Sequence, residues 1–245
     1  MSITINMRVE SYDVQPNGNI KISSLLKMLQ KAAGDDVNTT DLNYNNLSNH
    51  GIAFVLTKMT VQIIDNIKLY DELSIVSHPR KVRGASFPRD FIVYSNGNVV
   101  AKARSMWVLL DLNKRTILRP SVVDSIGYLA PSDEDSFEIA DIRRVIDDNS
   151  LLRTDVRRVD YSFLDMNKHL NNTYYSDFIF NCIPADFHLS DKDMYIQINY
   201  KAEALFNDVI DIKYDSLEEN SYDFIAVNKN NDKVCFTAYV CFCVE

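Results

Sequence analysis

Residues 160–172 concentrate side chains that can do chemistry. A carboxylate at Asp165, an amide at Asn167 and an imidazole at His169 follow one another at every second position. In an extended chain, side chains two residues apart project to the same side, so we expect these three to share one environment. Such a set can move a proton and orient a water molecule. The stretch therefore predicts the edge of an active site.

Two asparagines, Asn171 and Asn172, follow this trio and precede an aromatic-rich segment that begins at Tyr174. Asparagine is a favoured helix N-cap, and the free backbone N–H groups of a first helical turn can stabilise a developing oxyanion. We therefore predict a helix N-terminus at Asn171 and Asn172 that holds an oxyanion.

The charge of the chain restricts its partners. The net charge is −8, and no basic run carries interleaved aromatic residues, which argues against nucleic-acid binding. Residues 1–130 nevertheless carry a net charge of +4 against −12 for residues 131–245. The basic half is suited to an acidic partner. Its densest cluster, which we predict as a docking site, comprises Arg80, Lys81, Arg83 and Arg89.

Membrane and metal sites are not expected. No apolar run approaches the roughly 18 residues of a membrane span, so we expect no stable membrane insertion. The first residues alternate polar and apolar types without the apolar core of a signal peptide, which favours a cytoplasmic location. Four cysteines lack the paired spacing of a zinc site, and we expect reduced core thiols at Cys182, Cys235, Cys241 and Cys243.

The chain repeats itself. A strand, turn and apolar helix, then two strands joined by a polar bend, then a long final strand occur twice in the same order. The paired segments are residues 8–29 and 158–183, 59–73 and 194–209, and 99–110 and 233–244. Each helix must pack on a curved antiparallel sheet if both are to be buried, which predicts an α+β fold of two tandem hotdog domains, each sheet wrapped around one long central helix. We place the domains at 1–130 and 151–245, with an acidic linker at 131–150 that contains a short helix at 139–146.

The two halves differ at polar positions. Gln15 stands opposite Asp165, Asn19 stands opposite His169, and the position of Glu203 falls near Asn66 in the first half. Shared residues maintain the fold, whereas polar residues found in one half need another explanation. We infer one catalytic half and one half for binding and shape.

Residues 165–175 closely resemble the D-x-N-x-H-x-N-N-x-x-Y signature of acyl-acyl-carrier-protein (acyl-ACP) thioesterases. Residues 51–58, 89–91 and 103–111 also look like segments of the bacterial and plant enzymes, so the resemblance covers nearly the whole chain. It implies a tandem hotdog that hydrolyses the thioester between a fatty acyl chain and the phosphopantetheine arm of ACP, ending chain elongation. It implies no metal and no dissociable cofactor.

The resemblance also implies roles for single residues. Asn167 and His169 act with an acidic residue on the following strand, and Glu203 matches it by its Tyr-x-x-Glu setting. We expect Glu203, with His169, to activate or position a water molecule; alternatively, His169 polarises the carbonyl. Asn167 would hold the water or the carbonyl, and Asp165 would orient the set. Ala204 stands where plant members often have a cysteine, which argues against a Cys/His mechanism.

Several expectations concern the substrate. We expect the first half to bind the acyl chain through Met28, Leu29, Phe54 and Trp107. From the second half, we expect Tyr174 and Tyr175 to line the acyl pocket as well. An acyl-CoA thioesterase and a non-catalytic acyl-binding hotdog protein are the alternatives to an acyl-ACP thioesterase, because CoA presents the same thioester and hotdog folds need not be enzymes. A hotdog dehydratase fits the motif less well. A monomer and a homodimer both remain open.

Overall fold

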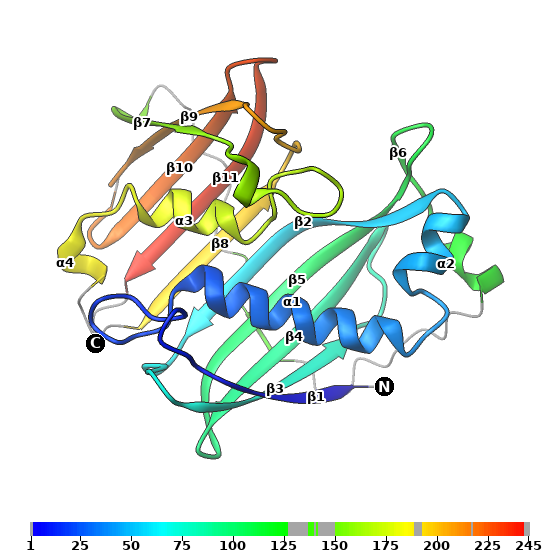
Figure 1. The fold of residues 1–245 in the computed structure, drawn as a ribbon, viewed down its shortest axis with the longest axis horizontal. Coiled ribbons are helices and arrows are strands. Elements are labelled where there is room, and N and C mark those ends of the chain that lie inside the picture. The colour runs from blue at the N-terminus through cyan, green and yellow to red at the C-terminus, as the bar shows by residue number, and fades with distance from the viewer. Residues whose placement is uncertain are drawn as a thin grey trace.

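Two successive sets of strands and helices make up the chain (Figure 1). The computed structural model describes residues 2–126, 137–139, 141, 150–188, 193–216 and 218–242. The first set comprises β1 (Ile3–Arg8), α1 (Ile22–Asn38), α2 (Tyr44–Asn49), β2 (Ile52–Ile63), β3 (Glu72–Pro79), β4 (Ser86–Ser95), β5 (Asn98–Asp111), β6 (Thr116–Ile117) and the 3-10 helix η1 (Pro120–Ile126). The second set comprises β7 (Arg153–Arg158), the 3-10 helix η3 (Tyr161–Phe163), α3 (Tyr174–Phe180), α4 (Ala185–His188), β8 (Met194–Tyr200), β9 (Val209–Asp215), β10 (Ser221–Asn228) and β11 (Lys233–Phe242).

The described strands form one antiparallel sheet in the order β1-β3-β4-β5-β2-β8-β11-β10-β9-β7, with β6 paired to β5. The halves meet at its centre, where β2 pairs with β8 from Lys58 opposite Asn199 to Ile63 opposite Met194. β2 begins earlier, at Ile52, and its first residues pair with β5 alone. Backbone hydrogen bonds therefore join the halves over one end of β2 and leave the other end without β8.

Helices α1 and α3 lie on the same face of this sheet (Figure 1). On α1, Leu25, Leu29 and Ala32 recur at helical spacing and are fully buried. Burying a leucine side chain contributes about 1.5–3 kcal/mol, so this stripe holds the helix to the sheet. The two helices also touch, since Lys27 Nζ lies 4.5 Å from the centroid of the Tyr174 ring.

Helix α3 is shorter than the sequence pattern predicts. The apolar run continues to Ile183, but the helix ends at Phe180. Single turns follow, in which the N–H groups of Cys182 and Ile183 donate to Ile179 O and Phe180 O. Pro184 disfavours helical dihedrals at Ile183, so the helix cannot continue through the whole apolar run.

A second apolar cluster lies at the α2 end of the first half. Its buried members are Leu42, Leu47, Ile52, Phe87, Leu109 and Val123. Trp107 packs against both this cluster and the main core. Asn43 caps α2, because its side chain accepts the N–H of Asn46 at 3.0 Å.

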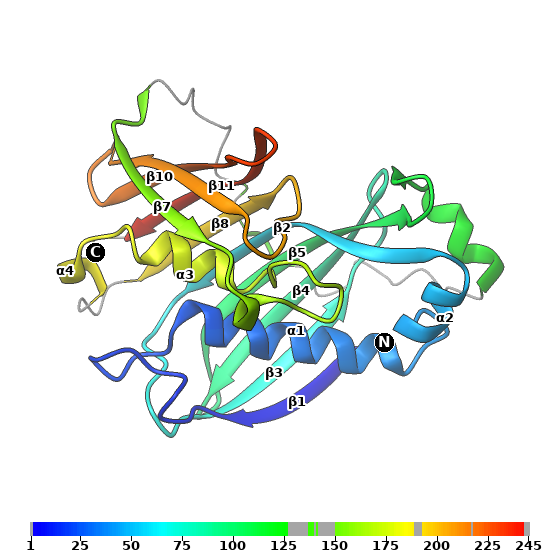
Figure 2. The same ribbon diagram turned by 45° about the horizontal axis from the view of Figure 1, so that its top comes forward.

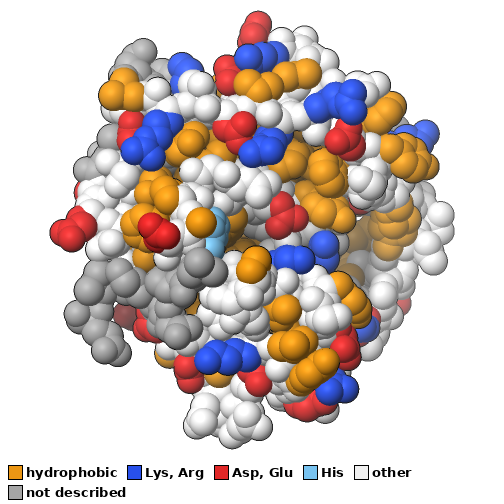
Figure 3. All heavy atoms as spheres, turned by 60° about the vertical axis from the view of Figure 1, so that its left-hand side comes forward, with side chains coloured by type: hydrophobic (Ala, Val, Ile, Leu, Met, Phe, Trp, Pro, Cys, Tyr) orange, Lys and Arg blue, Asp and Glu red, His pale blue; other side chains and the backbone are white. Residues whose placement is uncertain are grey.

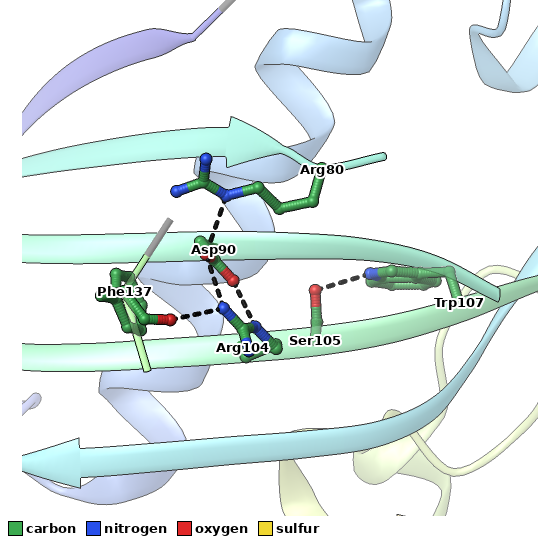
Figure 4. A network of polar contacts seen from close by, with 6 residues as sticks. All are labelled: Arg80, Asp90, Arg104, Ser105, Trp107 and Phe137. Carbon is green, nitrogen blue, oxygen red and sulfur yellow. Dashed lines mark hydrogen bonds and ion pairs between the residues drawn. The ribbon is translucent and has the colours of Figure 1, made fainter. Parts of the chain in front are cut away.

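The predicted linker lies largely outside the described residues, and so does most of the helix predicted at 139–146. Its described residues contact the first half: Phe137 O accepts a hydrogen bond from Arg104 Nη2 at 2.8 Å (Figure 4), and Asp141 pairs with Lys58 Nζ at 2.8 Å. The domain boundaries stay predictions. No helix in the described ranges is long and apolar enough to cross a bilayer.

Candidate active site

The segment from Leu164 to Leu170 is a tight turn, so the prediction of an extended chain here is wrong. Leu164 bridges Leu170, the N–H of Asp165 donates to His169 O at 2.8 Å, and the N–H of Lys168 donates to Asp165 O at 2.9 Å. Lys168 has a φ of 65°, in the left-handed region that reverses the chain. This loop between β7 and α3 extends from the second half toward the first in both views (Figures 1 and 2).

The Asp165 carboxylate stabilises this turn from inside. Its Oδ1 accepts the backbone N–H of Asn167 at 2.8 Å and that of His169 at 3.2 Å. Asp, with its short side chain, is a common residue for such turns. The trio is therefore held together by a carboxylate-capped turn in place of the predicted strand face.

Glu203 meets His169 across two elements. The N–H of Leu170 donates to Ala204 O at 2.8 Å, and His169 bridges Leu205, which lays the turn beside the loop between β8 and β9. His169 Nε2 then lies 3.2 Å from Glu203 Oε2, with side-chain exposures of 31% and 36%. An imidazole and a carboxylate at this distance, reachable from solvent, can share and transfer a proton.

The first half contributes two side chains to this region. The Tyr44 hydroxyl on α2 lies 3.5 Å from Asn167 Oδ1. The Arg115 guanidinium, from the turn between β5 and β6, contacts Glu203 Oε1. Sequence reasoning missed both, because neither belongs to a motif and each contact joins positions far apart in the chain.

The pKa of His169 is lowered from its usual value. Burial is the largest cause, because it disfavours the charged imidazolium. The nearby Asp165 carboxylate raises this pKa, and the Arg115 guanidinium lowers it. The net effect favours the neutral imidazole, which can accept a proton.

The predicted oxyanion site at Asn171 and Asn172 is not supported. The helix begins at Tyr174 with Thr173 as its N-cap. The N–H of Thr173 donates to Asn171 Oδ1 at 3.0 Å, that of Tyr174 donates to Asn171 O at 3.0 Å, and that of Asn171 donates to Phe163 O at 3.0 Å. Asn172 O accepts the Tyr200 hydroxyl at 3.2 Å. The N–H groups of Asn171, Thr173 and Tyr174 are therefore engaged within this turn and are not free for an oxyanion.

The side chains predicted to line an acyl pocket fall into two places. Met28, Leu29 and Tyr175 are buried in the main core, and the partly buried Tyr174 packs against it with its ring 5.0 Å from Phe163. Phe54 and Trp107 pack at the second cluster near α2, although Trp107 also reaches the main core. Their role in lining a pocket stays a prediction.

Two of the four predicted docking residues cannot dock a partner. Arg80 and Arg89 are buried: Arg80 Nε donates to Asp90 Oδ2 at 2.8 Å (Figure 4), and Arg89 Nη1 donates to Asp36 Oδ2 at 2.5 Å. Their positions on and next to strands, facing buried carboxylates, explain the error. Lys81 and Arg83 are exposed. On the face shown in Figure 3, basic and acidic side chains are interspersed.

No cysteine among the described residues is placed for catalysis beside His169. The Cys182 thiol donates to Phe178 O at 3.3 Å and burial raises its pKa to about 12, so it is not a ready thiolate. Cys235 is buried and Cys241 partly so, while Cys243 lies outside the described residues. Within the described ranges, no group of three His, Cys, Asp or Glu side chains is placed to hold a metal ion.

Comparison with known families matches both halves of the chain. Residues 2–126 match the model of the acyl-ACP thioesterase N-terminal domain, and residues 144–239 match that of the acyl-ACP thioesterase C-terminal domain. The chain is 25% identical over 229 residues to oleoyl-acyl carrier protein thioesterase 2, chloroplastic, of Arabidopsis thaliana, which covers 83% of this chain and 60% of that protein. A Coriandrum sativum oleoyl-acyl carrier protein thioesterase is 22% identical, with 83% and 59% covered. The chain thus spans about 60% of the length of these curated relatives.

Solved structures share the fold. An acyl-ACP thioesterase from Bacteroides thetaiotaomicron superposes with a TM-score of 0.81 at 22% identity, covering 98% of this chain and 97% of that one. A 12:0-ACP thioesterase from Umbellularia californica gives a TM-score of 0.85 at 16% identity, covering 100% and 98%. These likenesses confirm the predicted tandem hotdog fold.

Proposed function

The chain belongs to the acyl-ACP thioesterase family, and from this premise we propose that it hydrolyses the thioester of a fatty acyl chain carried by ACP. The observation that carries the proposal is the contact of His169 Nε2 with Glu203 Oε2 at 3.2 Å, formed between two separate loops of the second half. Family membership alone does not make a catalytic pair, whereas this geometry supplies a proton acceptor next to a carboxylate.

The proposed reaction needs no covalent nucleophile, because a thioester carbonyl is electrophilic and a thiolate leaves readily. Glu203, with the neutral His169, takes a proton from water as the water oxygen attacks the carbonyl carbon. The tetrahedral intermediate then collapses, the carbon–sulfur bond breaks, and the proton passes to the departing thiolate. The products are a free fatty acid and ACP with a free phosphopantetheine thiol.

Asn167 is the proposed donor to the carbonyl oxygen. Its Oδ1 faces the Tyr44 hydroxyl, which orients the amide so that Nδ2 can donate. An amide donor aimed at the developing oxyanion contributes about 100- to 1000-fold to turnover in comparable sites. Asp165 acts indirectly, since its carboxylate holds the turn that carries Asn167 and His169.

ACP is the proposed partner. Lys81 and Arg83 are what remains exposed of the basic cluster predicted for this role. A cytoplasmic location stays a prediction from the sequence.

The decisive experiment measures free fatty acid release from a panel of acyl-ACP substrates and matched acyl-CoA substrates. The intact protein is compared with Glu203→Gln, which removes the carboxylate charge and keeps the shape of the side chain. We expect hydrolysis with a preference for the ACP substrates, lost in the variant.

The other outcomes separate the alternatives. Faster turnover of acyl-CoA than of acyl-ACP would identify an acyl-CoA thioesterase. Tight acyl-ACP binding without fatty acid release would identify a binding protein. An unsaturated thioester as product would indicate a dehydratase. Undiminished hydrolysis by Glu203→Gln would refute the proposed site.

A further inference from the structure

Arg115 lies in a tightly built turn of the first half. Asp111 Oδ1 accepts the N–H groups of Asn113 and Lys114, each at 2.9 Å, and Asp111 O accepts the N–H of Arg115 at 2.8 Å. Arg115 has a φ of 55°, a left-handed conformation that is uncommon for residues other than glycine, asparagine and aspartate. Such a conformation persists only where the surroundings fix it, so the turn presents the arginine in a defined direction.

The arginine reaches a carboxylate of the other half. Its Nη2 contacts Oε1 of Glu203, whereas the second oxygen of that carboxylate, Oε2, faces His169 Nε2 at 3.2 Å. Glu203 thus connects a guanidinium from the first half to an imidazole from the second. One carboxylate oxygen is used for each partner.

We propose that Arg115 is a positioning residue, which holds Oε1 of Glu203 so that Oε2 faces His169. The inference rests on the proposed function, because Glu203 and His169 are the pair it serves. It changes the role of the first half, which then completes the catalytic centre in addition to any binding of the acyl chain.

The contact is better suited to fixing geometry than to stabilising the fold. With side-chain exposures of 55% for Arg115 and 36% for Glu203, water screens the pair. A partly exposed glutamate has several rotamers, and pairing one of its oxygens with a guanidinium selects among them. Misplacing a reacting group by about 1 Å can cost about 100-fold in rate, so a weak contact can still matter for turnover.

The electrostatics of the site act in the same direction. Three charged groups face His169: Asp165 from its own turn, Glu203 from the loop between β8 and β9, and Arg115 from the β5–β6 turn. Asp165 raises the pKa of His169, and Arg115 lowers it. Arg115 therefore favours the neutral imidazole as well as the orientation of Glu203.

The kinetic test compares Arg115→Ala and Arg115→Lys with Lys114→Ala, which removes the neighbouring cation of the same turn. On the best acyl-ACP substrate, we expect Arg115→Ala to lower kcat about 10- to 100-fold with little change in KM. Arg115→Lys should recover part of the loss, and Lys114→Ala should behave as the intact protein.

A double variant shows whether Arg115 acts through Glu203. In the Glu203→Gln background, Arg115→Ala should cause no further loss, because the group it positions is already disabled. Equal losses in both backgrounds, or an unchanged kcat in the single variant, would overturn the inference.

A measurement without substrate separates this inference from the proposed function. The ring of His169 is titrated by NMR and identified by the signal missing from His169→Ala. Arg115→Ala should move its titration to higher pH, whereas Lys114→Ala should not. Absence of hydrolysis by the intact protein would refute the proposed function alone, and an unshifted titration in Arg115→Ala would refute the contact.

Discussion

The turn that carries Asp165 and His169 has a counterpart of the same backbone structure in the first half. There the N–H of Gln15 donates to Asn19 O and the N–H of Gly18 donates to Gln15 O, both at 2.9 Å. These bonds match those of the second-half turn, and Gly18, with a φ of 81°, takes the left-handed position that Lys168 takes there. The scaffold is the same in both halves, so it cannot by itself explain why the proposed site lies in the second half.

The neighbouring loop is equivalent as well. The N–H of Ile20 donates to Ile67 O at 2.8 Å, as that of Leu170 donates to Ala204 O at 2.8 Å. The residues before these two acceptors, Asn66 and Glu203, therefore occupy equivalent places. The first half has an amide where the second has its proposed catalytic carboxylate.

The side chains of the two turns differ in what they contact. Gln15 Nε2 and Asn17 Nδ2 donate to His188 O at the end of α4, at 3.2 and 2.9 Å. Figure 1 shows the first-half loop beside α4. The second-half turn instead places His169 against Glu203, partly open to solvent. Both turns therefore contact the other half, the second-half turn through Tyr44, but only the second-half turn holds an imidazole against a carboxylate.

The strongest test of the difference between the two turns replaces the equivalent residues His169 and Asn19 with alanine, one at a time. His169→Ala should lower kcat by about 100- to 10,000-fold, the usual contribution of a positioned acid or base. Asn19→Ala should leave kcat unchanged when rates are normalised to folded protein. A similar loss in both variants would show that the first-half turn takes part in the reaction.

The next largest expected effect concerns the helices of the two halves. Helix α1 is much longer than α3, and near its end Asp36 forms a buried ion pair with Arg89. Arg89→Ala should destabilise the protein by about 3–5 kcal/mol, because it leaves the buried Asp36 carboxylate without its partner. Arg83→Ala, at an exposed position of the same basic cluster, should change the free energy of unfolding by less than about 0.5 kcal/mol. Denaturant unfolding measures both, and equal effects would contradict the burial of Arg89.

The smallest effect concerns the charge of Asp165, which the first half lacks because Gln15 stands there. Asp165 raises the pKa of His169, so Asp165→Asn should lower this pKa further and move the acid limb of kcat/KM to lower pH. Asp160→Asn, a change of an exposed acid paired with Arg158, is the control and should leave the profile in place. A shift of the acid limb to higher pH in Asp165→Asn would contradict the assignment that Asp165 raises the pKa of His169.

The same pKa makes stability depend on pH. Because the folded protein holds the His169 pKa below its unfolded value of about 6.5, its contribution to stability is fully present above that value. It is lost as the pH falls through the folded pKa. The fold and the activity should therefore weaken together on the acid side.

Much of this arrangement could be predicted from the sequence. The repeat gave the tandem fold, and its alignment placed Glu203 opposite Asn66, because equal spacing in two copies reproduces equal hydrogen bonds. The motif identified His169 and Asp165, although their spacing also suited a strand. A turn and a strand both bring residues at this spacing together. The left-handed backbone of Lys168 is what makes this segment a turn, and lysine does not signal that conformation in the sequence.

Other features depend on contacts that a single sequence does not encode locally. Whether an arginine is exposed depends on the strand register and on carboxylates far along the chain, as Asp36 shows for Arg89. The reach of Arg115 to Glu203 depends on how the halves are placed by the β2–β8 ladder. Asn171 fits both an N-cap and the turn it actually forms.

That ladder has a consequence for symmetry. In a homodimer of identical subunits, every substitution appears in both copies, so two equivalent sites must change together. Here the antiparallel pairing of β2 with β8 joins two similar units within one chain. Each turn is encoded separately, so one copy can carry an acid and an imidazole that the other does not have.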